Sequence, residues 1–365
     1  MKIPYQEYTL ESFIQFLKEN HDNVFDEEER KKWLKVYGVL HNLEDWRTRL
    51  FAPNETRKLG ELTEVKIPKG DVAESNRTTD EFYYAVEYRK GLLLFFTSAI
   101  QESYKATLEE RIQRTRGVTE AWISPGLFQQ VWQSTLERYG GYVYRFTSRR
   151  AALDDTPARI RPNYSRRFSY TGDDGTQVAK ELQDSYGVTP ESMYLRIDPS
   201  LIVQITNACF FSAREISQVA IQVLFNMLEI VADELLLTKT TSESLRYEIG
   251  NMLGEPALPR VASVTAGQIA LRGGPLNASM VQEFINNAED FSFLDQYTKE
   301  GSLAFSATVI DEAKGSVFDV SMSENDITMV PKFNTTFESF ITFLKAVRDQ
   351  LDERASLRVW GLTEG

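Results

Sequence analysis

Residues 81–98, EFYYAVEYRKGLLLFFTS, decide the fold that we expect for this chain. Glu81–Arg89 is rich in aromatic and β-branched residues, Lys90-Gly91 is a turn signal, and Leu92–Ser98 is a second apolar run. This pattern predicts two strands joined by a tight turn. The residues up to 149 then predict a helix, a strand, a helix and a strand. The order β-β-α-β-α-β indicates a βαβ-containing module near 81–150.

The two helices of this module carry start signals in the sequence. Thr107-Leu108-Glu109-Glu110 has the form of a capping box, which predicts that the first helix begins there and ends near Gly117. Ser124-Pro125 combines an N-cap residue with proline at the first helical position, so the second helix should begin at 125.

The flanking sequence predicts an α+β (mixed α/β) fold with further elements on both sides of the module. Residues 1–53 are expected to be an N-terminal helical segment, in part because Trp33, Leu34, Tyr37 and Leu40 have helical spacing. The polar stretch 54–80 is expected to be a linker with one short strand at 62–67. The remainder, 151–365, is expected to be a C-terminal α+β unit. Its predicted elements are a strand hairpin at 193–197 and 201–211, a long central helix opened by Ser212, strands at 304–310, 317–322 and 327–332, and a helix at 336–351.

A short internal similarity links the two ends of the chain. TLESFIQFLK at Thr9–Lys18 and TFESFITFLK at Thr336–Lys345 share eight of ten positions, and Pro4 aligns with Pro331 at the same offset. One interpretation is a duplicated strand–turn–helix module spanning 4–18 and 331–345. The other is two amphipathic helices that share cap and core residue types, since the similarity does not continue into the flanks.

Composition narrows the class of protein. The 365 residues carry a net charge of −12 and a single cysteine, Cys209, so an intrachain disulfide framework is impossible and a reducing compartment is favoured. No apolar run reaches the roughly 18 residues that a membrane span needs. We therefore expect a cytoplasmic protein with no membrane contact. The acidic average opposes nucleic acid as a default partner, although the charge is unevenly distributed.

Several common chemistries lack their residues. The only histidines, His21 and His41, lie far in sequence from any nucleophile, and neither a G-x-S-x-G nor a G-x-x-x-x-G-K-[ST] pattern occurs. Common zinc, calcium and dinucleotide patterns are also missing, so we predict no bound metal and no cofactor. One enzymatic alternative needs only carboxylates, for which Glu87 and Asp319 are the candidates: a Mg²⁺-dependent nuclease or phosphoryl transferase.

One segment is basic, although the chain as a whole is acidic. Between 145 and 167 the chain has seven arginines, no lysine, and only Asp154 and Asp155 to oppose them. Arginine suits bidentate contacts to phosphate and stacking on bases. Aromatic residues are interleaved, and alternation along a strand would place Tyr142, Tyr144 and Phe146 on one face and Arg145 on the other. The candidate nucleic-acid-binding residues are Arg145, Arg149, Arg150, Arg159, Arg161, Arg166, Arg167, Tyr164 and Phe168.

Three functions therefore stay open. The first is a non-catalytic nucleic-acid-binding or adaptor subunit of an intracellular multi-protein assembly, which would prefer single strands because rings and guanidinium groups together form a stacking platform. The second is the carboxylate-only metal-dependent enzyme. The third is a protein-interaction scaffold in which the arginines pair with acids of this chain or of a partner.

Overall fold

The computed structural model divides the chain into two compact units, one of Met1–Arg149 and Arg167–Leu236 and the other of Arg150–Arg166 and Leu237–Gly365. It describes the backbone of residues 3–20, 33–68, 80–150, 166–186, 188–214, 217–251, 260–298, 303–332, 334–352 and 354–359. Strands and helices occur in both units, which confirms the expected mixed α+β class. The predicted boundaries at 53 and 80 lie within the first unit, and the one at 150 lies beside the division at Arg149–Arg150.

The first unit is built on one large sheet, and every strand pairing whose register is given is antiparallel. Strand β6 (Val118–Glu120) pairs with β1 beside the main path. The order along that path is β2 (Thr56–Leu59), β3 (Leu62–Pro68), β4 (Asp80–Arg89), β5 (Leu92–Thr97), β1 (Leu34–His41), β11 (Phe210–Ala213), β10 (Ile202–Thr206), β9 (Val188–Arg196), β7 (Tyr142–Arg150) and β8 (Arg166–Thr171).

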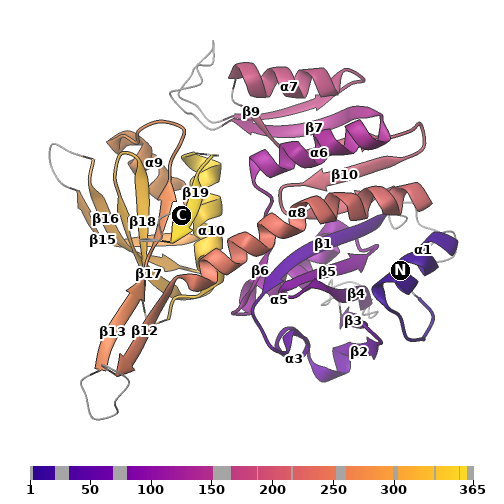
Figure 1. The fold of residues 1–365 in the computed structure, drawn as a ribbon, viewed down its shortest axis with the longest axis horizontal. Coiled ribbons are helices and arrows are strands. Elements are labelled where there is room, and N and C mark those ends of the chain that lie inside the picture. The colour runs from indigo at the N-terminus through magenta and orange to yellow at the C-terminus, as the bar shows by residue number, and fades with distance from the viewer. Residues whose placement is uncertain are drawn as a thin grey trace, which may run out of the picture. The chain divides into compact units, whose positions relative to one another are not determined.

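Helices cover both faces of this sheet near its centre. Helix α8 (Gln218–Ser244) crosses one face (Figure 1). Its Phe225 packs against Phe96 of the sheet, with ring centroids 6.2 Å apart. The other face carries a core of Tyr37, Phe95 and Tyr83 beneath α3 and the α4–η3–α5 segment. The helical elements of the unit are α1 (Leu10–Glu19), α3 (Trp46–Leu50), η2 (Pro53–Glu55), α4 (Gln101–Tyr104), η3 (Lys105–Glu109), α5 (Glu110–Arg114), α6 (Pro125–Tyr139), α7 (Gly175–Tyr186) and α8.

The predicted order β-β-α-β-α-β is confirmed by β4, β5, α4–η3–α5, β6, α6 and β7. One of the two predicted helix starts is wrong. The first helix begins at Gln101, ahead of the expected cap, because Thr107 lies within continuous helix and its hydroxyl bonds to Ser103 O. The second begins at Pro125 as predicted, and Ser124 Oγ accepts the Leu127 amide.

The helix expected around Trp33–Leu40 is wrong, because Leu34–His41 is strand β1. Seven of its eight residues are buried, so apolar side chains face both ways and the sequence shows a continuous apolar run without alternation. The segment 54–68, expected to be linker with one strand, forms η2 and the hairpin β2–β3.

The hairpin expected across Asp198-Pro199 is confirmed by β9 and β10, but its second arm divides at Asn207–Cys209 and returns as β11. The long helix begins at Gln218 instead of after Ser212. Ser212 belongs to β11, where its hydroxyl donates to Gln204 Oε1 rather than capping a helix.

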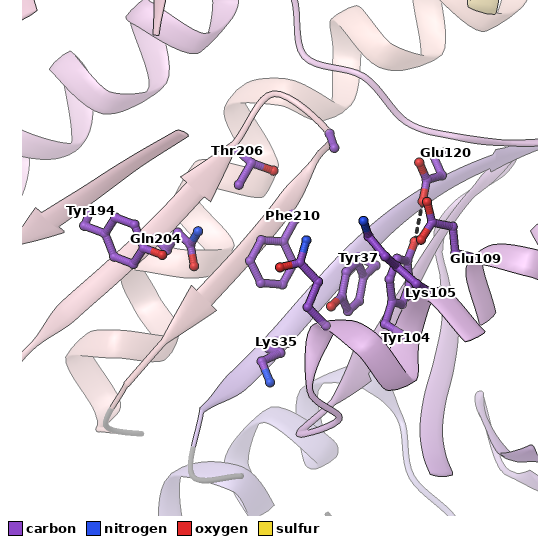
Figure 2. Close-up of a pocket in the computed structure, with 12 residues that line it drawn as sticks. Lys35, Tyr37, Tyr104, Lys105, Glu109, Glu120, Tyr194, Gln204, Thr206 and Phe210 are labelled. Atoms are coloured by element: carbon purple, nitrogen blue, oxygen red, sulfur yellow. Dashed lines mark hydrogen bonds between the residues drawn. The ribbon is translucent and has the colours of Figure 1, made fainter. Parts of the chain in front are cut away.

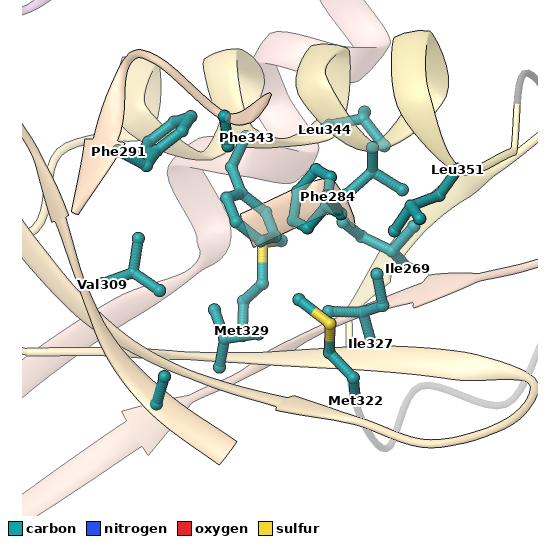
Figure 3. Packing of buried hydrophobic residues seen from close by; sticks show 14 of the residues in the cluster. Ile269, Phe284, Phe291, Val309, Met322, Ile327, Met329, Phe343, Leu344 and Leu351 are labelled. Carbon is teal, nitrogen blue, oxygen red and sulfur yellow. The ribbon is translucent and has the colours of Figure 1, made fainter. Parts of the chain in front are cut away.

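In its described residues the second unit has a six-stranded antiparallel sheet, a two-stranded ribbon, the end of α8, and helices α9 and α10. Phe343 on α10 packs among Phe284, Phe291 and Phe318 at centroid distances of 5.3–5.8 Å, which fixes the helix on the sheet. Figure 3 shows Phe343 beside Phe284 and Phe291. The predicted strands and helix of this region are confirmed. The elements are β12 (Arg246–Asn251), β13 (Arg260–Thr265), β14 (Gly267–Ala270), α9 (Ala278–Asn287), β15 (Phe291–Thr298), β16 (Phe305–Asp311), β17 (Ser316–Met322), β18 (Asp326–Pro331), α10 (Phe337–Gln350) and β19 (Ser356–Val359).

The two similar segments both form helices that begin directly after a threonine, α1 after Thr9 and α10 after Thr336. Their caps differ: Thr9 and Ser12 form a reciprocal capping box, whereas Thr336 makes no side-chain bond to the backbone of the first turn. Pro331 ends strand β18, whereas Pro4 lies outside any strand. Common descent of the two segments stays a hypothesis.

Candidate functional site

The predicted arginine segment is described only at its two ends. Arg145 in β7 is exposed, and its guanidinium carbon lies 5.6 Å from the centre of the Tyr194 ring on β9. Arg167 in β8 is 75% exposed and pairs with Glu191 at 3.5 Å. Phe168 in β8 is half-buried. For Arg149, Arg150 and Arg166 only the backbone is described, and Arg159, Arg161 and Tyr164 lie outside the described residues.

The rings near Arg145 do not form the continuous face that alternation predicted. Phe146 is fully buried and stacks on Tyr170, with centroids 5.4 Å apart, so it belongs to the core. Tyr142 and Tyr144 are half-buried, and both contact Arg196 of β9, whose guanidinium lies 4.3 Å from the Tyr144 ring. The expected platform of Tyr142, Tyr144 and Phe146 is therefore replaced by Tyr142, Tyr144 and Tyr194, whose rings contact Arg196 or Arg145.

Strands β9, β10, β11 and β1 present one apolar and one mixed face, because side chains alternate along each strand. Met193, Leu195, Val203, Ile205 and Phe211 are fully buried on the apolar face. On the mixed face, the strand register places side chains of neighbouring strands opposite one another. Opposed pairs on that face are Tyr194 with Gln204, Gln204 with Ser212, Ser212 with Lys35, Ser192 with Thr206, Thr206 with Phe210, and Phe210 with Tyr37.

A pocket of about 270 Å³ lies on the mixed face where the α4–η3–α5 segment adjoins it. Figure 2 shows Tyr194 and Gln204 on neighbouring strands, Phe210 and Tyr37 further along the sheet, and Glu109 and Glu120 at the end that the helical segment borders. All twelve lining residues belong to the first unit. They are Lys35, Tyr37, Gln101, Tyr104, Lys105, Glu109, Glu120, Tyr194, Gln204, Thr206, Ala208 and Phe210.

A π-helical turn supplies two of the charged groups. η3 (Lys105–Glu109) interrupts the helix between α4 and α5, and its Lys105 and Glu109 both line the pocket. Thr107 in the same turn bonds to the buried Tyr83 hydroxyl at 2.7 Å, which ties the turn to the sheet. Such turns are often found at functional sites, because the extra residue re-aims the side chains that follow.

The aromatic wall of the pocket is rigid. Tyr37 and Tyr104 stack face to face, with centroids 3.7 Å apart and planes 4° from parallel, and Phe210 lies 4.8 Å from Tyr37. Burial raises the pKa of both tyrosines well above the usual range, and nearby Glu120 and Glu109 raise the pKa further. The phenols therefore keep their protons, and Tyr104 donates to Glu120 Oε1 at 2.5 Å.

The polar groups on the floor and rim are held in defined orientations. Gln204 Oε1 accepts from Ser212 at 3.2 Å, and its Nε2 donates to Ser192 at 3.4 Å. Lys35 donates to the carbonyl oxygens of Ser98 and Ala99. Burial lowers the pKa of Lys35 to about 8, although Glu81 and Glu102 oppose that shift.

Sequence reasoning missed most of this pocket, since its residues come from five separate stretches of the chain. Arg196 was missed because it lies outside the arginine-rich window, although Tyr194 and Arg196 alternate with the buried Met193 and Leu195. That alternation in strand β9 was the available signal.

The two carboxylates proposed for a metal site are engaged elsewhere. Glu87 accepts the Gly91 amide and lies 3.3 Å from His41. Asp319 pairs with Lys332 at 2.7 Å and accepts from Thr308. Across the ranges that the structure describes, no three His, Cys, Asp or Glu side chains group in a way that could hold a metal ion. Cys209 is fully buried.

Comparison with known proteins gives a family match over part of the chain and a distant relative. A family model described as a middle domain matches residues 130–199, which include β7, β8, β9 and thus Arg145, Tyr194 and Arg196. An uncharacterized protein of Archaeoglobus fulgidus is 23% identical over 282 residues, which cover 72% of this chain and 74% of that protein. No solved structure matches. None of the helices in the described ranges is long and apolar enough to cross a membrane.

Proposed function

We propose that this protein is a non-catalytic, single-strand nucleic-acid-binding subunit of an intracellular, cytoplasmic assembly, and that it binds through the surface made by β7, β9 and β10. The observation that carries the proposal is the position of Tyr194. Its ring lines the pocket and also lies under the Arg145 guanidinium, so an arginine of the predicted segment and an aromatic pocket meet at one side chain.

The chemistry of the surface suits a single strand. Tyr142, Tyr144 and Tyr194 offer rings for base stacking, while Arg145 and Arg196 offer cations for the backbone. Arg196 stays oriented because it lies over Tyr144 and donates to the Tyr142 hydroxyl at 3.1 Å, so little freedom is lost when it contacts a phosphate. A duplex would hide its base faces from these rings, which is why we favour single strands.

The overall charge of −12 opposes this binding at long range, so the proposal depends on the local arrangement. Arg167 is partly neutralised by Glu191, whereas the Arg145 side chain is exposed. We therefore expect modest affinity that falls with added salt. The protein-partner role rests on the acidic remainder of the surface and is a separate part of the proposal.

The test is fluorescence anisotropy of labelled single- and double-stranded DNA and RNA across a salt series. For single strands, log K should change with log salt by about −0.7 for each phosphate neutralised. Replacing both Arg145 and Arg196 by alanine should make the slope of log K against log salt shallower by about 1.4, if each arginine contacts one phosphate. Arg246→Ala is the control, since Arg246 lies in β12 of the other unit and is 63% exposed.

Two outcomes would contradict the proposal. One is no binding of any strand at low salt, which would favour the scaffold alternative, in which the arginines meet acidic groups of a protein. The other is binding that the double substitution leaves unchanged, which would place the interface elsewhere on the chain.

A further inference from the structure

The pocket beside Tyr194 has features of its own that the proposed backbone contacts do not use. We propose that it receives one unstacked nucleobase of the bound strand and favours adenine or cytosine, which carry an amino group at C6 or C4, over thymine or uracil, which carry a carbonyl oxygen at C4. This inference rests on the proposed function, and it adds a base preference to it.

The size of the pocket limits what can enter. Its 270 Å³ lies just below the range of about 300–1,000 Å³ that is usual for sites of drug-sized ligands and cofactors, so a single base fits better than a whole dinucleotide. Strand β10 separates β9 from β11, so Tyr194 and Phe210 stand on strands roughly 10 Å apart, at two strand spacings. Gln204 and Thr206 of β10 form the floor between them, which leaves room for one flat ring (Figure 2).

The walls suit a planar aromatic ligand. Tyr194 is half-exposed at one side, and Phe210 continues into the Tyr37–Tyr104 stack at the other. Because the Tyr37 and Tyr104 rings already stack on each other, they cannot close over the space that a base would fill. Stacking on such rings is tolerant of base identity, so the walls contribute affinity and the polar groups must contribute the preference.

The polar groups at the helical end are two acceptors, Glu109 and Glu120, with the cation Lys105 beside them. Glu109 and Glu120 both line the pocket, and Tyr104 already donates to one oxygen of Glu120. A carboxylate has room for several donors, so Glu120 can accept another. The amino group of cytosine or adenine is such a donor, whereas the carbonyl oxygen at the same position in thymine or uracil would face a carboxylate without a proton between them.

The floor adds groups that can read a base edge. Gln204 is fixed by Ser212 and Ser192, which leaves its second amide hydrogen and its second oxygen lone pair available. The Thr206 hydroxyl oxygen is buried and has no hydrogen-bond partner within the described part of the chain. Lys35 is turned toward the carbonyl oxygens of Ser98 and Ala99, so it does not neutralise the carboxylates from within the pocket.

The experiment compares labelled oligothymidylate with strands that carry one central cytosine, adenine or abasic site. We expect the cytosine and adenine strands to bind about tenfold more tightly than the thymine strand, as one well-placed hydrogen bond to a base edge provides. Glu120→Gln and Glu109→Gln should bring that ratio to within threefold, because glutamine offers a donor as well as an acceptor. Glu110→Gln is the matched control, since Glu110 pairs with Arg114 on the helix surface and does not line the pocket.

The outcomes separate the two proposals. Equal binding of all strands, or a preference that survives both substitutions, would overturn the base pocket and leave single-strand binding intact. Binding of none of the strands would overturn the proposed function itself. Thermal midpoints within about 2 °C of the unmodified protein would show that the variants remain folded.

Discussion

Gly38 and Cys209 lie in a contact that can be tested by stability measurements alone. Gly38 is in the middle of β1, and its amide donates to the Cys209 carbonyl oxygen at 3.0 Å. A methyl group at Gly38 would stand 2.5 Å from Cys209 Sγ, while the next neighbour, Cys209 Cβ, would be 3.3 Å away. Cys209 is fully buried and has a left-handed backbone with φ of 49°, so neither its side chain nor its backbone can move away freely.

We expect Gly38→Ala to lower the free energy of unfolding of the first unit by about 1–3 kcal/mol, the usual cost of overpacking a closed core. Removal of the sulfur should relieve most of this cost, because the remaining contact of 3.3 Å is one that a small shift can accommodate. In Cys209→Ala protein, the same Gly38→Ala change should therefore cost less than about 0.5 kcal/mol, so the coupling energy should exceed about 1 kcal/mol.

The assay is urea unfolding of the four proteins of this cycle, followed by tryptophan fluorescence. Trp46, Trp122 and Trp132 are buried in the first unit and report on its unfolding. Additive effects, with a coupling energy below about 0.5 kcal/mol, would refute the close approach of the Asn207–Cys209 turn to β1. Since that turn carries Ala208 and Phe210 to the pocket, Gly38→Ala should also weaken oligonucleotide binding.

Three further predictions concern the pocket and the two cores. Tyr194→Ala should weaken binding of a single strand by about 5- to 150-fold, because stacking of one base on a ring is worth about 1–3 kcal/mol, whereas Tyr194→Phe should stay within threefold. Equal losses for the two variants in anisotropy titrations would argue against stacking. Phe343→Ala should destabilise the second unit by about 3–5 kcal/mol, since the Phe343 ring is fully buried among three other aromatic rings. Amide hydrogen exchange of strands β16–β18 should then become faster. Unchanged exchange rates would contradict this packing. Burial lowers the pKa of Lys35 from its usual 10.5 to about 8 in the folded chain, so between these pH values the unfolded chain binds more protons than the folded chain. The free energy of unfolding should therefore rise with pH from 8 to 10.5, relative to that of Lys35→Met. A constant difference in urea midpoint between the two proteins would refute this.

Local sequence signals predicted the helix starts and turns that depend on adjacent residues. Ser124-Pro125 marked the start of α6, and the run from Glu81 to Ser98 marked the hairpin β4–β5, because caps and turns are determined by adjacent residues. Strand β1 was missed because it is buried on both faces, so its sequence lacks the alternation that identifies a strand with one exposed face.

The pocket could not be predicted because long-range pairing creates it. Tyr194, Gln204, Phe210 and Tyr37 become neighbours only when β9, β10, β11 and β1 pair in the observed register. The sequence did direct attention to Arg145, yet its partner Tyr194 lies 49 positions further along the chain. Phe146, expected beside Tyr142 and Tyr144 on the platform, is instead part of the core.

The most direct test of the central claim is the affinity of the purified protein for labelled single-stranded DNA and RNA, measured by anisotropy at several salt concentrations. We predict binding that weakens with salt and that loses about 1.4 in the slope of log K against log salt when Arg145 and Arg196 are both replaced by alanine. No binding at low salt, or a slope that the two substitutions do not change, would contradict the claim that this surface binds nucleic acid.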